Sequence, residues 1–222
     1  MSKSVSSDSR KTYLAVKVDV VDSRRASDRS ALQRQLFAAT DTCNSRLGEA
    51  VAARFVVTHG DEVQGMLHTP ASEALVSCLE VWVDALRPHQ LRFGIGAGSL
   101  STPLRQEAIG MDGEAWYRAK EAVDTAHGRR KHLHISGLPG DGDRVIAAVA
   151  NLLLTLRTDW TDKQLHAVGL VERYDTQQEA AAAMGVTPTT FSRHLAAAHW
   201  HEYREGRTAL KLLMAELYTK GD

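Results

Sequence analysis

The chain has 222 residues, 43% of them hydrophobic, which is enough for one large core or for a core plus a small second domain. Lys and Arg together number 27, as do Asp and Glu, so no net charge draws the whole protein onto nucleic acid. No apolar run approaches the roughly 20 residues that span a bilayer, and residues 1–11 are polar and Ser-rich, without the hydrophobic segment of a signal peptide. We therefore expect a cytoplasmic protein that does not contact a membrane and has a disordered tail over residues 1–11.

An alternating pattern over residues 13–21 predicts the first strand. Its two faces carry different chemistry: Leu14, Val16, Val18 and Val20 lie on one, and Ala15, Lys17 and Asp19 on the other. The next expected elements are a helix over 28–53, strands over 54–58 and 62–67, a helix over 71–86, a strand over 91–97, a helix over 113–126 and a short strand over 132–135.

Two glycine patterns in this region have distinct meanings. His59 and Gly60 separate two predicted strands and indicate a tight hairpin turn, because Gly60 can adopt a positive φ. The run from Gly94 to Gly98 lacks the spacing and the following helix of a dinucleotide-binding loop. It favours a strand that packs closely under a helix.

The order βαββαβ, with one more helix and a strand, predicts an α+β protein with a ferredoxin-like antiparallel sheet and helices on one face. This domain is expected over residues 12–137. The segment GLPGDG at 137–142 is a clear break, and helical patterns dominate after it. We therefore expect a second, all-helical domain over residues 143–222. The two cysteines, Cys43 and Cys78, fall in separate helical segments without metal-ligand spacing, which indicates reduced thiols.

The segment TQQEAAAAMGVTPTTFSRHL at 176–195 predicts a helix-turn-helix over residues 176–198. Ala180 and Ala183 are small where a second helix must cross. Gly185 suits the end of the first helix, and Val186 then enters the core. The residues that start and pack the second helix are Thr187 as N-cap, Pro188 at the first position, and Phe191 and Leu195 facing inward. The candidate DNA-binding residues are Thr187, Thr189, Thr190, Arg193 and His194. A helical hairpin that touches no DNA is the alternative.

The net positive charge around this motif is small for a DNA-binding protein. Residues 176–211 include four cations and three acids: Arg193, Arg204, Arg207 and Lys211 against Glu179, Glu202 and Glu205. A homodimer would double the contacts with double-stranded DNA, so we expect one. In the last helix, an apolar stripe either completes the core of the small domain, which we favour, or pairs across a dimer; it consists of Leu210, Leu213, Met214 and Leu217.

Asp19 lies in an otherwise apolar strand, where a carboxylate needs a partner. Asp61 follows the predicted hairpin turn, and we expect the first strand to lie beside the second and third, so that both carboxylates converge on a Mg²⁺ or Mn²⁺ ion and a nucleotide. The candidate nucleotide-binding residues are Val20, Asp22, Ser23, Arg24 and Arg25 in the loop after the strand, with Gly60 and Glu62 at the turn. Alternatively, Lys17 or an arginine neutralises Asp19 without a metal.

Four blocks of this sequence, VKVDVVDSR, HGDEVQG, RFGIGAG and GMDGEAWYRAKEA, resemble the palm domain of class III nucleotidyl cyclases and GGDEF diguanylate cyclases. The resemblance implies that Asp19 and Asp61 bind two divalent metals and a triphosphate. Joined to a C-terminal helix-turn-helix over the full length, the blocks resemble the SatD family of small bacterial proteins more closely. The stretch from 160 to 213 is similar to the region-4 helix-turn-helix of sigma factors.

The sequence departs from the cyclase pattern at three positions. His59 replaces the first glycine of GGDEF, and Tyr117 and Glu121 stand where cyclases carry asparagine and arginine. These differences disfavour cyclisation, because Glu121 reverses the charge that stabilises the transition state. We therefore predict a DNA-binding transcriptional regulator whose palm-like domain senses a nucleotide or metal–nucleotide. The alternative is an active nucleotidyl cyclase or nucleotidyltransferase that uses Asp19 and Asp61.

Overall fold

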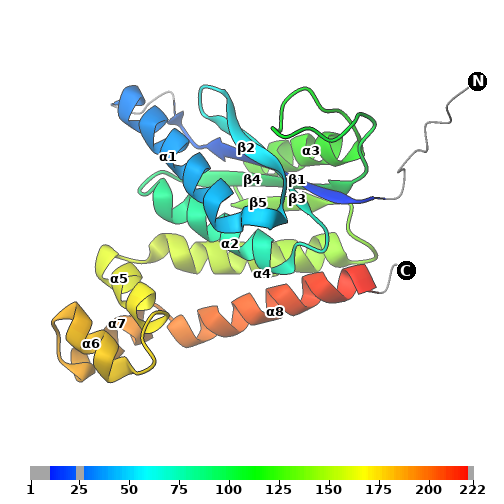
Figure 1. The fold of residues 1–222 in the computed structure, drawn as a ribbon. Helices are drawn as coiled ribbons and strands as arrows, with labels where there is room; N and C mark the ends of the chain where they lie inside the picture. The colour runs from blue at the N-terminus through cyan, green and yellow to red at the C-terminus, as the bar shows by residue number, and fades with distance from the viewer. Residues whose placement is uncertain (1–10, 24–27, 220–222) are drawn as a thin grey trace, which may run out of the picture.

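The computed structural model describes residues 11–23 and 28–219 (Figure 1). The tail expected over 1–11 therefore lies outside the described residues, except for Lys11. The elements in chain order are β1 (Tyr13–Val20), α1 (Arg29–Leu47), the short 3-10 helix η2 (Gly48–Ala50), β2 (Val51–His59), β3 (Glu62–His68), α2 (Ser72–Ala85), β4 (Leu91–Gly98), α3 (Glu114–Gly128), β5 (Leu133–Ser136), α4 (Gly142–Asp159), α5 (Asp162–Val171), α6 (Gln177–Met184), α7 (Pro188–Ala197) and α8 (Trp200–Thr219).

The five strands form one sheet in the order β2-β3-β1-β4-β5. The first four strands are antiparallel to their neighbours, and β5 is parallel to β4. This confirms the α+β class and the predicted strand series. The expectation that β1 lies beside β2 was wrong, because the tight β2–β3 turn places β3 between them. That turn consists of Gly60 and Asp61, since His59 pairs directly with Glu62.

Helices cover both faces of the sheet, and not one face as predicted (Figure 1). The face of β1 that carries Leu14, Val16 and Val18 joins the core formed with α1 and α2. The opposite face, including Ala15, packs with Trp116 and other residues of α3. The predicted alternation of β1 is therefore confirmed, and the additional helix α3 buries the second face.

Two glycines of β4 allow α3 to lie directly on the sheet. A Cβ atom at Gly94 would fall 2.3 Å from the carbonyl oxygen of Ala119, and one at Gly96 would fall 2.1 Å from that of Ala115. Real Cβ atoms do not approach backbone so closely, so any side chain here would push the helix away. The predicted close packing of this glycine run under a helix is confirmed.

The C-terminal helices share the core of the sheet domain. α4 packs against α2 and β5, α8 packs against α2 and α4, and α5–α7 form a group at one end of these helices (Figure 1). Leu210 and Met214 of α8 belong to the same hydrophobic cluster as Leu14. The predicted boundary at 137–143 coincides with the turn into α4, where the core continues without a break. The division into two domains stays a prediction.

A buried polar network ties α4 and α8 to α2. Arg157 of α4 donates two hydrogen bonds to Asp84, of 2.9 and 2.6 Å, and one of 3.1 Å to the hydroxyl of Tyr203. Glu80, which is only 4% exposed, accepts a 2.8 Å bond from Tyr203 and lies 2.9 Å from Nε of Arg207. Each buried charge therefore faces an opposite charge and hydrogen-bond partners, as burial requires.

The two cysteines meet across the contact between α1 and α2. Both are free and fully buried, and their Sγ atoms lie 3.9 Å apart. The expectation of reduced thiols is confirmed, although their proximity was not foreseen. Burial raises the pKa of the Cys78 thiol, which keeps it protonated and unreactive.

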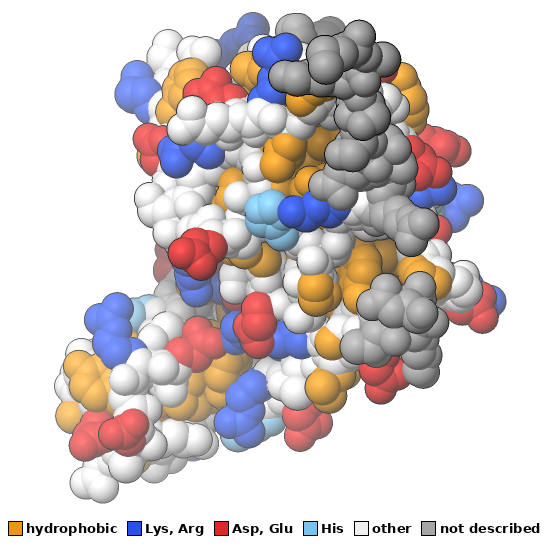
Figure 2. All heavy atoms as spheres, turned by 45° about the vertical axis from the view of Figure 1, so that its right-hand side comes forward, with side chains coloured by type: hydrophobic (Ala, Val, Ile, Leu, Met, Phe, Trp, Pro, Cys, Tyr) orange, Lys and Arg blue, Asp and Glu red, His pale blue; other side chains and the backbone are white. Residues whose placement is uncertain are grey.

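The surface mixes charges of both signs. Figure 2 shows cationic and anionic side chains interspersed over one face of the molecule, in keeping with the equal numbers of the two in the sequence. Among the described residues, no helix has the length and apolar composition that crossing a bilayer requires.

We expect Glu80→Ala to lower the free energy of unfolding by about 3 kcal/mol, because it leaves Arg157 and Arg207 buried beside a missing anion. Glu73→Ala is the matched control. Glu73 pairs with Lys211 between the same helices but is exposed, so its loss should cost about 1 kcal/mol or less. Urea denaturation measures both. Equal losses for the two variants would contradict a special role of the buried network.

Candidate functional site

A cleft of about 500 Å³ opens at the end of the sheet where β1 finishes. Its walls are the end of β1, the β2–β3 turn and the C-terminal half of α3. The lining residues are Lys17, Val18, Asp19, Val20, Asp22, Ser23, Asp61, Glu62, Lys120, Val123, Asp124 and His127. The cleft is therefore strongly polar and contains side chains of both charges.

Asp19 and Asp61 converge in this cleft, as the sequence predicted. Asp19 lies on the central strand, between Glu62 of β3 and Arg92 of β4. Asp61 occupies the turn after β2 and accepts a hydrogen bond from Ser23. Burial raises the pKa of the Asp19 carboxyl, and the negative charge of Asp61 raises it further. The pair is thus an anionic centre whose charge the fold leaves only partly compensated.

Lys17 does not neutralise Asp19. Its ammonium group pairs with Glu62, across the strand boundary. Among the described residues no ion pair joins Asp19 to a cation, so the alternative of a purely structural pair is not seen there. Glu62, predicted to bind nucleotide, lines the cleft and pairs with Lys17 there.

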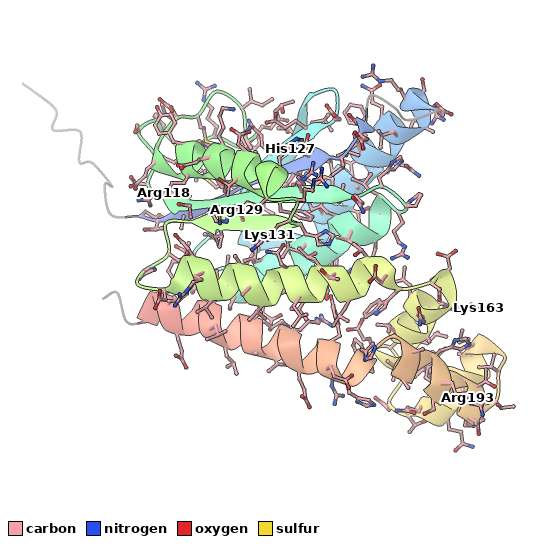
Figure 3. The ribbon with its side chains drawn as sticks, turned by 180° about the vertical axis from the view of Figure 1, so that it is seen from behind. Arg118, His127, Arg129, Lys131, Lys163 and Arg193 are labelled. Carbon is pink, nitrogen blue, oxygen red and sulfur yellow. The ribbon has the colours of Figure 1, made fainter. Side chains whose placement is uncertain are left out.

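The wall opposite the carboxylates carries both charges. Lys120, Asp124 and His127 enter the cleft from α3, and Lys120 pairs with Asp124 at 3.6 Å. Arg92 of β4 donates from Nη1 to Nδ1 of His127 at 2.9 Å (His127 is labelled in Figure 3). The charges of Arg92 and His127 oppose the effects of burial and of Asp61 on the pKa of Asp19. A ligand that fits both walls would carry anionic groups together with a cation.

Lys120 and His127 line the cleft but were not among the residues predicted for this site. Their place depends on α3 crossing the face of the sheet that carries Asp19, a contact that a helical pattern alone does not specify. The available signal was Gly94 and Gly96, whose missing side chains bring α3 onto that face.

The other predicted nucleotide-binding residues have different outcomes. Val20, Asp22 and Ser23 line the cleft. Gly60 does not; it borders a smaller hollow of about 150 Å³ next to it, which Ser23 and Asp61 share. Arg24 and Arg25 lie outside the described residues.

The carboxylates suit a cation that arrives with phosphate oxygens. Among the described residues, no group of three or more His, Cys, Asp or Glu side chains is arranged to hold a metal by itself. Mg²⁺ commonly uses one or two protein carboxylates, with water and substrate phosphates as its other ligands. Asp19 and Asp61 fit that pattern better than that of a resident structural metal.

The segment 176–198 forms two short helices, with the predicted ends at Gly185 and Thr187. Thr176 and Glu179 form a capping box at the start of α6. Gly185 ends α6 in the left-handed conformation, with φ of 72°, and Thr187 caps α7 by accepting a 3.2 Å bond from the amide of Thr190. Phe191 is fully buried, as expected.

The predicted packing of α6 needs one correction. Ala180 and Ala181 are buried, whereas Ala183, expected at a helix crossing, is exposed. Val186 is partly buried against the core.

The candidate DNA-binding residues of α7 lie on its outer face. Thr187, Thr189, Thr190 and Arg193 are exposed, and His194 is half-buried. The hydroxyls of Thr187 and Thr190 are 3.0 Å apart and serve the cap. Thr189 and Arg193 are one helical turn apart, and Arg193 points outward at the far end of the molecule (Figure 3).

A model of the SatD family matches residues 13–214 of the chain. The chain belongs to the SatD family. No curated protein matches this SatD-family chain. Its family membership covers the sheet, the cleft and all of the C-terminal helices, except the last residues of α8.

Several solved structures are similar to the SatD-family chain at low sequence identity. The catalytic core of a rhodopsin-guanylyl cyclase is 18% identical, covers 56% of this chain and 75% of its own, and has a TM-score of 0.42. A microbial GGDEF domain is 19% identical, with coverage of 54% and 72% and a TM-score of 0.41. A regulator of polyketide synthase expression from Bifidobacterium adolescentis is 12% identical, with coverage of 96% and 82% and a TM-score of 0.29.

We expect Asp19→Asn to stabilise the ligand-free protein at pH 7 by about 1 kcal/mol, or roughly 3 °C in Tm. The pKa of Asp19 is raised in the fold, so ionising it costs more in the folded chain than in the unfolded chain. The advantage of the variant should shrink as the pH falls through the raised pKa of Asp19 and should vanish below about pH 3, where the carboxyl is protonated in the unfolded chain as well. Thermal melts across this range test the expectation, and Asp41→Asn on the exposed face of α1 is the control. A gain that does not change with pH would contradict it.

Proposed function

We propose that this protein is a DNA-binding transcriptional regulator whose sheet domain senses a metal–nucleotide. The observation that carries the proposal is the outer face of α7, where Thr189 and Arg193 are exposed one turn apart on a helix fixed by caps and by the buried Phe191. A helix held in this way behind a second short helix suits the major groove of DNA.

The chemistry of α7 supports reading of bases. Arginine can bond two acceptors of guanine at once, and threonine can bond a base or contact the methyl group of thymine. Within the described residues, Arg193 takes part in no ion pair, and it is therefore available for such a contact. The α6–turn–α7 segment would then act as a helix-turn-helix, with α7 as its recognition helix.

The two-signed cleft supports the sensing role. Asp19 and Asp61 are suited to a divalent cation, and the Lys120 ammonium beside Asp124 and the His127 imidazole held by Arg92 can donate to phosphate oxygens opposite them. A metal–nucleotide complex carries both kinds of group. Exposed Tyr117 and Glu121 occupy the cyclase positions for asparagine and arginine, which favours binding over cyclisation.

The shared core offers a route between the two sites. α4 rests on β5 and α2 of the sheet domain and leads directly into α5, against which α6 and α7 pack. A ligand that binds one orientation of α4 more tightly than another would shift how α7 is presented. Homodimerisation would add a second α7, although Leu210 and Met214 are committed to the core of a single chain and cannot form its interface.

We expect Arg193→Ala to weaken binding to DNA from the protein's own promoter by about fivefold or more, because a bidentate arginine–base contact contributes about 1–3 kcal/mol. Fluorescence anisotropy measures the affinity, with unrelated DNA as competitor. Arg34→Ala is the matched control, since Arg34 is an exposed arginine on α1, away from α7. Equal affinity of the two variants would refute the proposed role of α7. Absence of binding by the parent protein would refute DNA regulation altogether.

We expect Mg²⁺ with a nucleoside triphosphate to raise the free energy of unfolding by about 2.7 kcal/mol at a hundredfold excess over Kd. Asp19→Asn and Asp61→Asn should abolish this effect, although Asp19→Asn is the more stable protein without ligand. Asp41→Asn on α1 should keep it. Melts with each of the four nucleotides, with and without Mg²⁺, test the expectation. If pyrophosphate is released in the same samples and the release requires Asp19 and Asp61, the protein is instead a nucleotidyl cyclase or nucleotidyltransferase.

A further inference from the structure

The cations near α7 are fewer than the sequence suggests. Of the four expected there, Arg207 pairs with Glu80 and Glu172, and Lys211 pairs with Glu73. Arg193 and Arg204 remain available. Affinity for DNA depends largely on neutralised phosphates, so a protein with so few free cations at its recognition helix needs positive charge elsewhere.

The turn between α3 and β5 supplies such charge. Arg129, Arg130 and Lys131 are consecutive and exposed, and no ion pair within the described part of the chain uses any of them. Their positive field extends to the next strand. Burial lowers the pKa of His134, and Arg129 and Lys131 lower it further.

The backbone of this turn is fixed, and it contains an arginine where glycine would be less strained. The amide of Arg130 donates to the carbonyl of His127 at 3.1 Å, and that of Lys131 donates to the carbonyl of Ala126 at 3.0 Å. This is the pattern that ends many helices, with a left-handed residue that is usually glycine. Arg130 has a φ of 52°, so its Cβ is crowded there. The chain thus keeps a cation at a position where its backbone favours glycine.

The turn lies near the end of α4 that leads to α5–α7. Asn151 of α4 bonds both the amide and the carbonyl of Leu133, two residues after Lys131. From Asn151 to the end of α4 is about 12 Å at 1.5 Å per residue. Arg129, Lys131, Lys163 of α5 and Arg193 are all seen from one side of the molecule (Figure 3).

We propose that Arg129, Arg130 and Lys131 form a second contact with DNA, binding the phosphate backbone of the duplex that α7 engages. This inference rests on the proposed DNA-binding function. It says which residues supply the positive charge that the surroundings of α7 lack. The contact reads no sequence; it positions the duplex and strengthens binding to any DNA. Acids lie beside the strand that follows the turn: Asp159 opposes the lowering of the His132 pKa by burial, and Asp143 and Glu121 do the same for the pKa of His134.

Arg130→Gly separates a binding role from a structural one, because it should change stability and affinity in opposite directions. Glycine relieves the left-handed backbone, so Tm should stay unchanged or rise by up to about 3 °C. Affinity for DNA should nevertheless fall on promoter and unrelated DNA alike, and the slope of log K against log salt should become shallower by about 0.9. Full affinity and an unchanged slope in this folded variant would overturn the inference.

The double variant Arg129→Gln/Lys131→Gln should make the salt slope shallower by about 1.8. Its matched control is Arg34→Gln/Arg46→Gln, which removes two exposed arginines of α1 on the other side of the sheet and should leave the slope unchanged. Equal effects of both pairs would show a general charge effect and overturn the inference. Binding to phosphatidylserine vesicles is the second measurement. If the turn variant loses vesicle binding but keeps full DNA binding, while the α1 control keeps both, the inference is also overturned.

The outcomes also separate this inference from the proposed function. If Arg193→Ala weakens binding and the turn variants do not, α7 binds DNA and the second contact is wrong. If the turn variants weaken binding and Arg193→Ala does not, the turn contact stands and the role of α7 is wrong. If the parent protein binds no DNA at low salt, both are wrong.

Discussion

The arrangement of this molecule depends on the buried contact between Arg157 and the carboxylates of α2. Asp84 and Glu80 approach Arg157 from one helix, and Tyr203 approaches it from α8. Charges buried in this way are stable only when all partners are present, so α4 and α8 can occupy only one position against the sheet domain. Hydrophobic contacts around them would tolerate sliding by a residue, whereas a bidentate bond would not.

This constraint explains how two features of different character coexist on a short chain. The cleft needs a rigid sheet, because Asp19 lies on β1 and Asp61 on the β2–β3 turn, and their spacing depends on the register of β1 with β3. The α5–α7 group needs a rigid support, because it follows α4 directly in the chain and α7 packs against α8. The same buried network holds α4 and α8, which carry the α5–α7 group, against α2 of the domain that contains the cleft.

The sequence indicated most of this structure where the deciding forces are local. The alternation of β1, the cap at Thr187 and the left-handed Gly185 depend on neighbours in the chain, and all were predicted correctly. The convergence of Asp19 and Asp61 was also predicted, although for a wrong neighbour of β1. The wall formed by α3 could not be predicted, since Arg92 and His127 meet only after α3 docks across β4.

The position of α3, and with it one wall of the cleft, depends on two residues that have no side chain. Gly94 and Gly96 hold the axis of α3 at the smallest separation from the sheet that backbone atoms allow. A change to alanine at either position would substitute no residue of the cleft. It would nevertheless push α3 outward, together with Lys120 and His127. Descendants of this chain that keep all the charged residues but lose one of these glycines should therefore have a wider cleft, suited to a bulkier ligand or to none.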